Sequence, residues 1–301
     1  MNRSAKIWLL AGTCLILAGC ILLGGVLMAN NFQWGALSTV KFETNKSELS
    51  QTFQNILIVT DTADIEFLPS DTTAGKVVCR ELKKVRHTVA VQNGTLTVQV
   101  NDSRKWYEHI GIQFHTPKIT LYLPKGEYGE LSIQSSTGNA TIPADFQFGS
   151  MDISLSTGHI TNHASTSGDL HLKTDTGNIR VENISANAIA LHISTGNTTL
   201  TDITCKSLSS EGDTGNITLT NITATKKFSI ERTTGDIKLM RCDAAEIIMT
   251  TDTGNISGNL LTNKIFITKT DTGNIDVPAC TTGGTCQITT STGNIKIHIA
   301  K

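Results

Sequence analysis

The chain has 301 residues, a formal net charge of −1 and few aromatic residues. This near-neutral charge gives no electrostatic basis for binding nucleic acid, and the length suffices for a sizeable core or one elongated domain. Beyond Asn30, the residues Ile, Val, Leu and Thr recur at alternate positions, a pattern typical of β-strands.

The chain begins with an apolar run, residues 7–29, that contains no charged side chain. As a helix this run is roughly 34 Å long, enough to cross a bilayer. Arg3 and Lys6 precede it, and no charged residue follows before Lys41. The positive-inside rule therefore predicts that residues 1–30 are a single-pass signal-anchor, with the N-terminus cytoplasmic and residues 31–301 extracellular.

Two other ways of processing this N-terminal segment stay open. The letters "LAGC" at 17–20 match a bacterial lipobox, in which Cys20 would carry the lipid. The nine residues after Cys20 are apolar, however, where a mature lipoprotein normally has a polar tether. The segment is also compatible with a cleaved signal peptide. All three fates export the rest of the chain.

The next part of the chain is predicted to start and cap a longer β-structure. Residues 31–50 are expected to form a polar connector and residues 51–130 an N-terminal β region. Asn93-Gly94 lies between two alternating strands and predicts a hairpin with a type I′ turn. "SRKWYEHIGIQF" at 103–114 combines aromatic and charged residues. It is interpreted either as a capping loop that buries Trp106, or as a recognition patch of Trp106, Tyr107 and His109.

A repeat dominates residues 131–301. A Thr-Gly pair recurs nine times with a period of about 19 residues, and Asn usually follows it, as in "TDTGNI". The nine glycines are Gly138, Gly158, Gly177, Gly196, Gly215, Gly235, Gly254, Gly273 and Gly293. A nearly constant period of this length indicates a solenoid built from one repeated coil.

The residues around each glycine predict the form of the coil. Counting from the glycine, positions +2 and +4 and positions −7 and −5 are mostly apolar, and position +7 adds a further apolar residue. This period of two predicts two strands with one face inward. The fold class is therefore all-β, a single parallel β-helix that we expect to be right-handed. Nine coils about 4.8 Å apart make a rod of roughly 40 Å. "GNIKIHIAK" at 293–301 is expected to form a strand that leaves an open edge, and the sequence leaves open whether this end caps itself or pairs with another chain.

The repeated motif itself is interpreted as a structural corner. Glycine in the third place of Asp/Ser-Thr-Gly-Asn suits a β-turn that needs a positive φ. Thr and Asn on successive coils are expected to form hydrogen-bonded ladders. A repeated ligand site is the alternative. Calcium between Asp252 and Asp271 on neighbouring coils is disfavoured, because the preceding coils do not repeat the acid in step.

Seven cysteines are present, and their wide spacing does not indicate a disulfide framework. No Cys-x-x-Cys occurs, so the spacing gives no support for a zinc site. Cys280 and Cys286 are a candidate disulfide, with buried free thiols as the alternative. Cys205 and Cys242 lie about two coils apart, which is too far to bridge.

Taken together, "FQNILIVTDTADIEFLP", "ITLYLPKGEYGELSIQSSTGNATI" and the serial "TDTGNI" units resemble the bacterial "putative adhesin" family of envelope proteins. The resemblance covers residues 50–301. It implies a β-helix-like fold at the cell surface, and it brings no catalytic motif.

The function expected from these observations is that of a non-catalytic, membrane-anchored surface module for interaction or adhesion. Its ligand would be a cell-wall component, a glycan or a protein, and no cofactor or metal is expected. The alternative is an envelope-stress or regulatory accessory that acts through a membrane partner. A polysaccharide-active enzyme is less favoured, because the corners are short and no acid and base converge.

Overall fold

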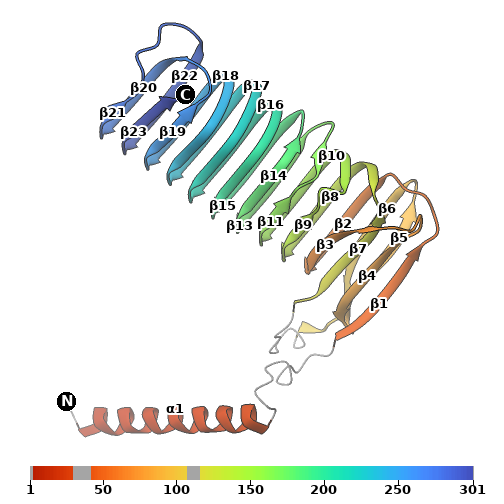
Figure 1. Ribbon diagram of the computed structural model, residues 1–301. Helices are drawn as coiled ribbons and strands as arrows, with labels where there is room; N and C mark the ends of the chain where they lie inside the picture. The colour runs from red at the N-terminus through yellow and green to blue at the C-terminus, as the bar shows by residue number, and fades with distance from the viewer. Residues whose placement is uncertain (1–2, 30–41, 107–115, 301) are drawn as a thin grey trace. The chain divides into compact units, whose positions relative to one another are not determined.

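The computed structural model describes residues 3–29, 42–106 and 116–300 (Figure 1). By contacts the chain divides into two units: residues 1–42 with 104–116, and residues 43–103 with 117–301. The first unit contains α1 (Arg3–Ala29), the one α-helix among the described residues. Its span Ala5–Ala29 has a mean hydropathy of 2.3 and is long and apolar enough to cross a membrane. Its large apolar side chains, such as Trp8 and Leu15, are mostly exposed, which suits contact with lipid.

The second unit is a β-solenoid, whose strands stack along one direction in Figure 1. The N-terminal strands are β1 (Phe42–Leu49), β2 (Asn55–Thr62), β3 (Asp64–Ser70), β4 (Gly75–Leu82), β5 (Val85–Gln92), β6 (Thr95–Asp102) and β7 (Lys118–Pro124). The strands of the repeats are β8 (Gly126–Thr137), β9 (Ala140–Ile142), β10 (Phe146–Thr157), β11 (Ile160–Asn162), β12 (Ser165–Thr166), β13 (Leu170–Thr176), β14 (Ile179–Ser185), β15 (Ala188–Thr195), β16 (Thr198–Thr214), β17 (Ile217–Thr234), β18 (Ile237–Thr253), β19 (Ile256–Leu260), β20 (Lys264–Thr272), β21 (Ile275–Asp276), β22 (Gly284–Thr292) and β23 (Ile295–Ile299).

The coils pair in parallel and almost perfect register, which confirms the predicted solenoid. β16 pairs with β17 from Thr198↔Ile217 to Thr214↔Thr234, one repeat apart throughout. The register shifts between Leu239 and Cys242, and also between Ala224 and Lys227 in the corner where the longer repeats have their extra residue. A β-bulge there absorbs the extra residue of the longer repeats. Longer and shorter repeats can therefore follow one another without disturbing the Thr-Gly corner.

The interior is filled by the inward residues of the alternating pattern. Ile160, Ile179, Ile217, Ile237 and Ile256, all at position +2, are essentially inaccessible to solvent. Most other inward positions are equally buried and belong to one continuous core. Burial of this apolar surface is the main force that holds the coils together.

Two constraints make glycine necessary at the Thr-Gly corner. All nine glycines have positive φ, from 130° to 158°, as the sequence predicted. The coils also approach too closely for a side chain: a Cβ on Gly196 would lie 1.6 Å from the carbonyl oxygen of Gly177, and eight of the nine would meet the glycine of the adjacent coil. For Gly138 that neighbour is Ala63, from the glycine-free "DTADI". The column of corners therefore extends one coil beyond the repeats.

The residue after each glycine forms the predicted ladder of hydrogen bonds. The backbone N–H of Asn197 donates to Oδ1 of Asn178 at 2.8 Å, and the N–H of Asn216 donates to Oδ1 of Asn197 at 2.9 Å. His159 takes the same place with its Nδ1, which accepts from the N–H of Asn178 at 2.9 Å. The position after the glycine therefore requires a side-chain acceptor long enough to reach the backbone N–H of the next coil, and Asn, Asp and neutral His all supply one.

The strand order departs from the chain order at the C-terminal end of the solenoid. β22 pairs with β18 on one side and β20 on the other, and β23 lies between β19 and β21 (Figure 1). The last strand is therefore an inner strand, and the expectation that residues 295–299 form the open edge is wrong. The outermost coil is instead β20 and β21, where Ile275 is 45% exposed at an otherwise buried position.

The same strand order bears on the calcium site considered between Asp252 and Asp271. These two residues are not on adjacent coils, because the coil that contains Ser291 lies between them, so the pairing considered for calcium is absent.

The strand order also departs from the chain order at the N-terminal end of the solenoid. β2 lies between β6 and β8, so a coil that comes later in the chain lies outside the earlier one. The hairpin of β4 and β5 then runs antiparallel to β7 and β6 and covers their edges. Asn93 and Gly94 at its far turn have φ of 51° and 74°, which confirms the predicted β5–β6 hairpin. β1 pairs with β4, so the expected connector 31–50 contains a strand whose Leu49 is buried.

The charged side chain of Arg232 lies in the solenoid core. Arg232 is 2% exposed, and burial lowers its pKa to about 10. It donates to the hydroxyls of Ser210 and Thr198 and to two backbone carbonyls, while its Nε has no partner among the described residues. Gly212 in the adjacent coil leaves the space for the guanidinium group, since a Cβ there would lie 2.8 Å from a guanidinium nitrogen.

A column of left-handed residues at position +6 from the Thr-Gly glycine gives a testable expectation. Asn183, Asp202, Asn221 and Arg241 have φ between 53° and 56°. Asn and Asp tolerate this conformation, whereas other L-residues are strained by about 1–2 kcal/mol. We expect Arg241→Asn to raise the free energy of unfolding by about 1 kcal/mol, measured from urea unfolding curves.

A substitution in a neighbouring strand supplies the control. Lys238 is an exposed residue of β18 with ordinary φ, so Lys238→Asn has no strain to relieve and places a poor strand former in the sheet. It should leave stability unchanged or lower it slightly. A stabilising Lys238→Asn, or a destabilising Arg241→Asn, would contradict this account.

Candidate functional site

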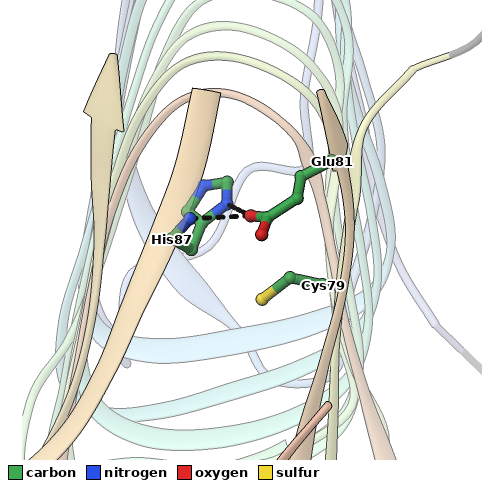
Figure 2. Close-up of side chains that lie close together, drawn as sticks. All are labelled: Cys79, Glu81 and His87. Carbon is green, nitrogen blue, oxygen red and sulfur yellow. Dashed lines mark hydrogen bonds and ion pairs between the residues drawn. The ribbon is translucent and has the colours of Figure 1, made fainter. Parts of the chain in front are cut away.

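The N-terminal cap encloses a cluster of Cys79, Glu81 and His87 (Figure 2). Cys79 and Glu81 are two residues apart on β4, so their side chains lie on the same face of the strand. His87 lies on β5, which follows the tight corner at Lys83 and Lys84 and pairs with β4 at Leu82↔Val85. The thiol, carboxylate and imidazole all lie within 4.8 Å of one another.

Hydrogen bonds fix the carboxylate and the imidazole of this cluster. Oε2 of Glu81 lies 2.7 Å from Nδ1 of His87 and also accepts from the backbone N–H of His87 at 2.7 Å. Asn45 of β1 donates from Nδ2 to Oε1 of Glu81 at 2.6 Å. On the other side of the ring, Nε2 of His87 lies 2.8 Å from Oγ1 of Thr60 in β2. The cluster therefore links four strands of the cap.

The cluster is closed to solvent. The side chains of Glu81 and His87 are each 2% exposed, and Cys79 is 2% exposed. Burial, with a smaller contribution from the charge of Glu81, raises the pKa of Cys79 to about 12. Cys79 is therefore a neutral thiol at physiological pH when nothing is bound to it.

The order Thr60–His87–Glu81 has the connectivity of a hydrolase triad, in which a hydroxyl bonds to an imidazole that an acid orients. Acyl transfer also needs a substrate carbonyl next to the hydroxyl and donors for the oxyanion. Thr60 is only 5% exposed and faces the interior, so a substrate cannot reach it in this structure. The enclosed cluster of Thr60, His87 and Glu81 has room only for a small bound species, such as an ion, and does not present its hydroxyl to a large substrate.

The residues predicted as sites lie elsewhere. Trp106 is 80% exposed, and Tyr107 and His109 lie outside the described residues, so both interpretations of this segment stay predictions. Cys280 lies in the loop after β21 and is half-buried, Cys286 is buried in β22, and both are free thiols. The nine glycines of the corners stack as one column.

The buried cluster is not evident from the sequence, because Cys79, Glu81 and His87 match no spacing rule for metal or catalytic motifs. One signal was present. Val77, Cys79 and Glu81 occupy alternate positions of one strand, and an acid in an otherwise apolar inward series implies a buried partner. The partner, His87, becomes evident only once β4 and β5 are known to form a hairpin.

Comparison with known proteins identifies the fold. A "putative lipid binding protein" from Parabacteroides distasonis is similar over 87% of this chain and 98% of its own, with 14% identity and a TM-score of 0.51. A "putative adhesin" from the same organism is similar over 86% and 98%, with 13% identity and a TM-score of 0.51. A "putative adhesin" from Bacteroides fragilis is similar over 86% of this chain and 97% of its own, with 16% identity and a TM-score of 0.49.

No curated protein matches the chain. The model of the Toastrack DUF4097 family matches residues 53–298, which include β2 to β23 except the final residue of β23, the three residues of the buried cluster and every Thr-Gly corner. The chain belongs to the Toastrack DUF4097 family.

Proposed function

We propose that the protein is a membrane-tethered surface module whose solenoid lies outside the cell and binds an extended, hydroxyl-rich polymer of the envelope. The export signals of the N-terminal segment support the location, and α1 is long enough to be the tether. The resemblance in fold to proteins named as adhesins agrees with an interaction role. A rigid solenoid with regular faces is a common platform for extended ligands.

One row of outward residues carries the proposal. Along one face the register brings together a hydroxyl or a cation from each of eight strands: Thr141, Thr161, Arg180, Thr199, Thr218, Lys238, Ser257 and Lys296. An acid flanks each end of this row, Glu66 beside Thr141 and Asp276 beside Lys296. Strands are about 4.8 Å apart, so this hydroxyl–cation row extends over roughly 34 Å. Arg180 is paired with Glu182, so hydroxyl hydrogen bonds rather than net charge are expected to dominate recognition.

Binding to purified cell-wall material tests the proposal. The double variant Thr199→Val, Thr218→Val removes two neighbouring hydroxyls of the row while keeping side-chain shape and strand propensity. We expect the full chain in detergent to sediment with wall polymer, and the variant to bind about tenfold more weakly, since each lost hydrogen bond contributes about 0.5–1.5 kcal/mol.

The matched control lies on the other strand run of the coil. Thr250 and Thr289 are also neighbours in register and similarly half-buried, so Thr250→Val, Thr289→Val makes the same chemical change away from the row. This control should bind as the unmodified chain does. Absence of binding to any wall or glycan preparation, or equal loss in both variants, would refute the proposed surface. Recovery of one membrane protein by crosslinking instead would favour the regulatory role.

A further inference from the structure

We propose that Cys79, Glu81 and His87 form a binding site for one zinc-like divalent transition-metal ion, buried in the N-terminal cap. The three side chains are donors that zinc commonly takes in proteins, namely a thiolate, a carboxylate oxygen and an imidazole nitrogen. They come from two paired strands and converge on one point, with the donor atoms within 4.8 Å of one another (Figure 2). This site is independent of the hydroxyl–cation row.

The three donor atoms lie within 4.8 Å of one another, whereas a thiolate sulfur bound to zinc at about 2.3 Å lies roughly 3.6 Å from the other ligand atoms, so binding requires movements of up to roughly an ångström. In a tetrahedral site with bonds of about 2.0–2.1 Å to nitrogen and oxygen, the two ligand atoms lie roughly 3.3 Å apart. Nδ1 of His87 and Oε2 of Glu81 are 2.7 Å apart, so these two atoms would have to separate by a few tenths of an ångström, which a small rotation of either side chain achieves. The metal would replace the hydrogen bond between them, with Sγ of Cys79 as the third ligand.

The surrounding hydrogen bonds already have the form that a metal site needs. A histidine ligand normally donates its other ring N–H to a fixed acceptor, and a carboxylate ligand is held by a donor on its free oxygen. Thr60 lies 2.8 Å from Nε2 of His87 and can accept from it once Nδ1 binds the metal. Asn45 donates to Oε1 of Glu81 and leaves Oε2 directed at the imidazole.

Charge balance favours a divalent ion. A buried charge is tolerated only when it is compensated nearby. Binding would release the thiol proton of Cys79 to solvent, leaving one thiolate and one carboxylate opposite a charge of +2, so the loaded site is neutral. A soft thiolate together with an imidazole selects zinc or a similar transition metal over calcium or magnesium, which prefer oxygen ligands. The fourth position would hold a water molecule.

Cobalt substitution provides a direct test on the full chain in detergent, reduced and freed of metal by a chelator. We expect Co²⁺ to saturate at one ion per chain and to produce a thiolate-to-cobalt absorption in the near ultraviolet, which Zn²⁺ then removes by competition. Cys79→Ser should lose this absorption. Cys205→Ser makes the same change at another buried thiol, remote from any such cluster, and should keep it.

A milder variant covers the case in which Cys79→Ser fails to fold. Thr60→Val keeps the shape of the side chain but removes the acceptor from Nε2 of His87, and we expect it to weaken Co²⁺ affinity about tenfold while the absorption band keeps its position. Zn²⁺ should also raise the melting temperature of the unmodified chain. Absence of the band at saturating Co²⁺, or its persistence in Cys79→Ser, would show that the cluster is only a hydrogen-bonded part of the core.

Discussion

Truncation of the chain after Gly283 is expected to disturb two coils of the solenoid, although it removes only one. The deleted residues contain β22 and β23, which lie between β18–β19 and β20–β21. Within the described chain, β20 and β21 have no parallel partner other than these strands. Without them, the amides of residues 264–283 should exchange faster than in the full chain, as measured by hydrogen exchange with mass spectrometry, because stacking directly on β18 and β19 would have to replace the observed pairing.

An internal deletion of similar size should have the opposite result. Removing residues 264–283 joins Asn263 to Gly284 and deletes the outermost coil in space. It also brings Gly293 to a position one ordinary repeat after Gly254. β22 and β23 can then follow β19 in simple succession, with their pairing to β18 and β19 unchanged. If the internal deletion unfolds this end while the truncation leaves residues 264–283 protected, the observed strand order is wrong.

Gly215→Ala is expected to lower the free energy of unfolding by about 2–5 kcal/mol. The left-handed backbone contributes about 1–2 kcal/mol, and forcing an atom into a filled space contributes about 1–3 kcal/mol. Gly215 has φ of 132°, and a Cβ there would lie 1.9 Å from the carbonyl oxygen of Gly196. Because the obstacle is backbone, it can move only by separating the two coils. Chemical denaturation of the two proteins would measure the difference.

Gly94→Ala separates the two causes. Gly94 also has positive φ, 74°, but a Cβ there would contact nothing within 4 Å. It should therefore show only the backbone contribution, about 1–2 kcal/mol. Equal losses at Gly94 and Gly215 would mean that the stacking of corners adds nothing to the requirement for glycine.

The coil could be predicted from the sequence because its determinants are local. Alternation, the turn-forming glycine and the constant period each depend on residues within one repeat, and the structure confirms the inward positions that they indicate. These local features do not predict the order in which the coils stack. Each coil presents the same pairing edges and the same glycine corner to any neighbour, so the repeats themselves do not distinguish chain order from the order observed.

Two departures from the pattern do mark the exchanged coil. Ile275 holds the inward position +2 but is 45% exposed, and Leu261 at +7 is exposed because Leu260 pairs with Cys242 in its place. Neither can be detected from the letters alone, because both residues fit the apolar pattern. The buried cluster was missed for a related reason: its members belong to different strands, and their meeting depends on how the cap folds.

The exchanged order at the C-terminal end also has a consequence for how the protein acquires its structure. Residues 264–276 are synthesised before residues 284–299, yet they belong one coil further out. When they leave the ribosome, the strands on which they will rest have not yet been synthesised. Their native partners arrive only with the final segment, so the last two coils must form together in one late event. Until then β18 and β19 remain an unpaired edge, which is the period in which the nascent rod is most exposed to association with another copy of itself.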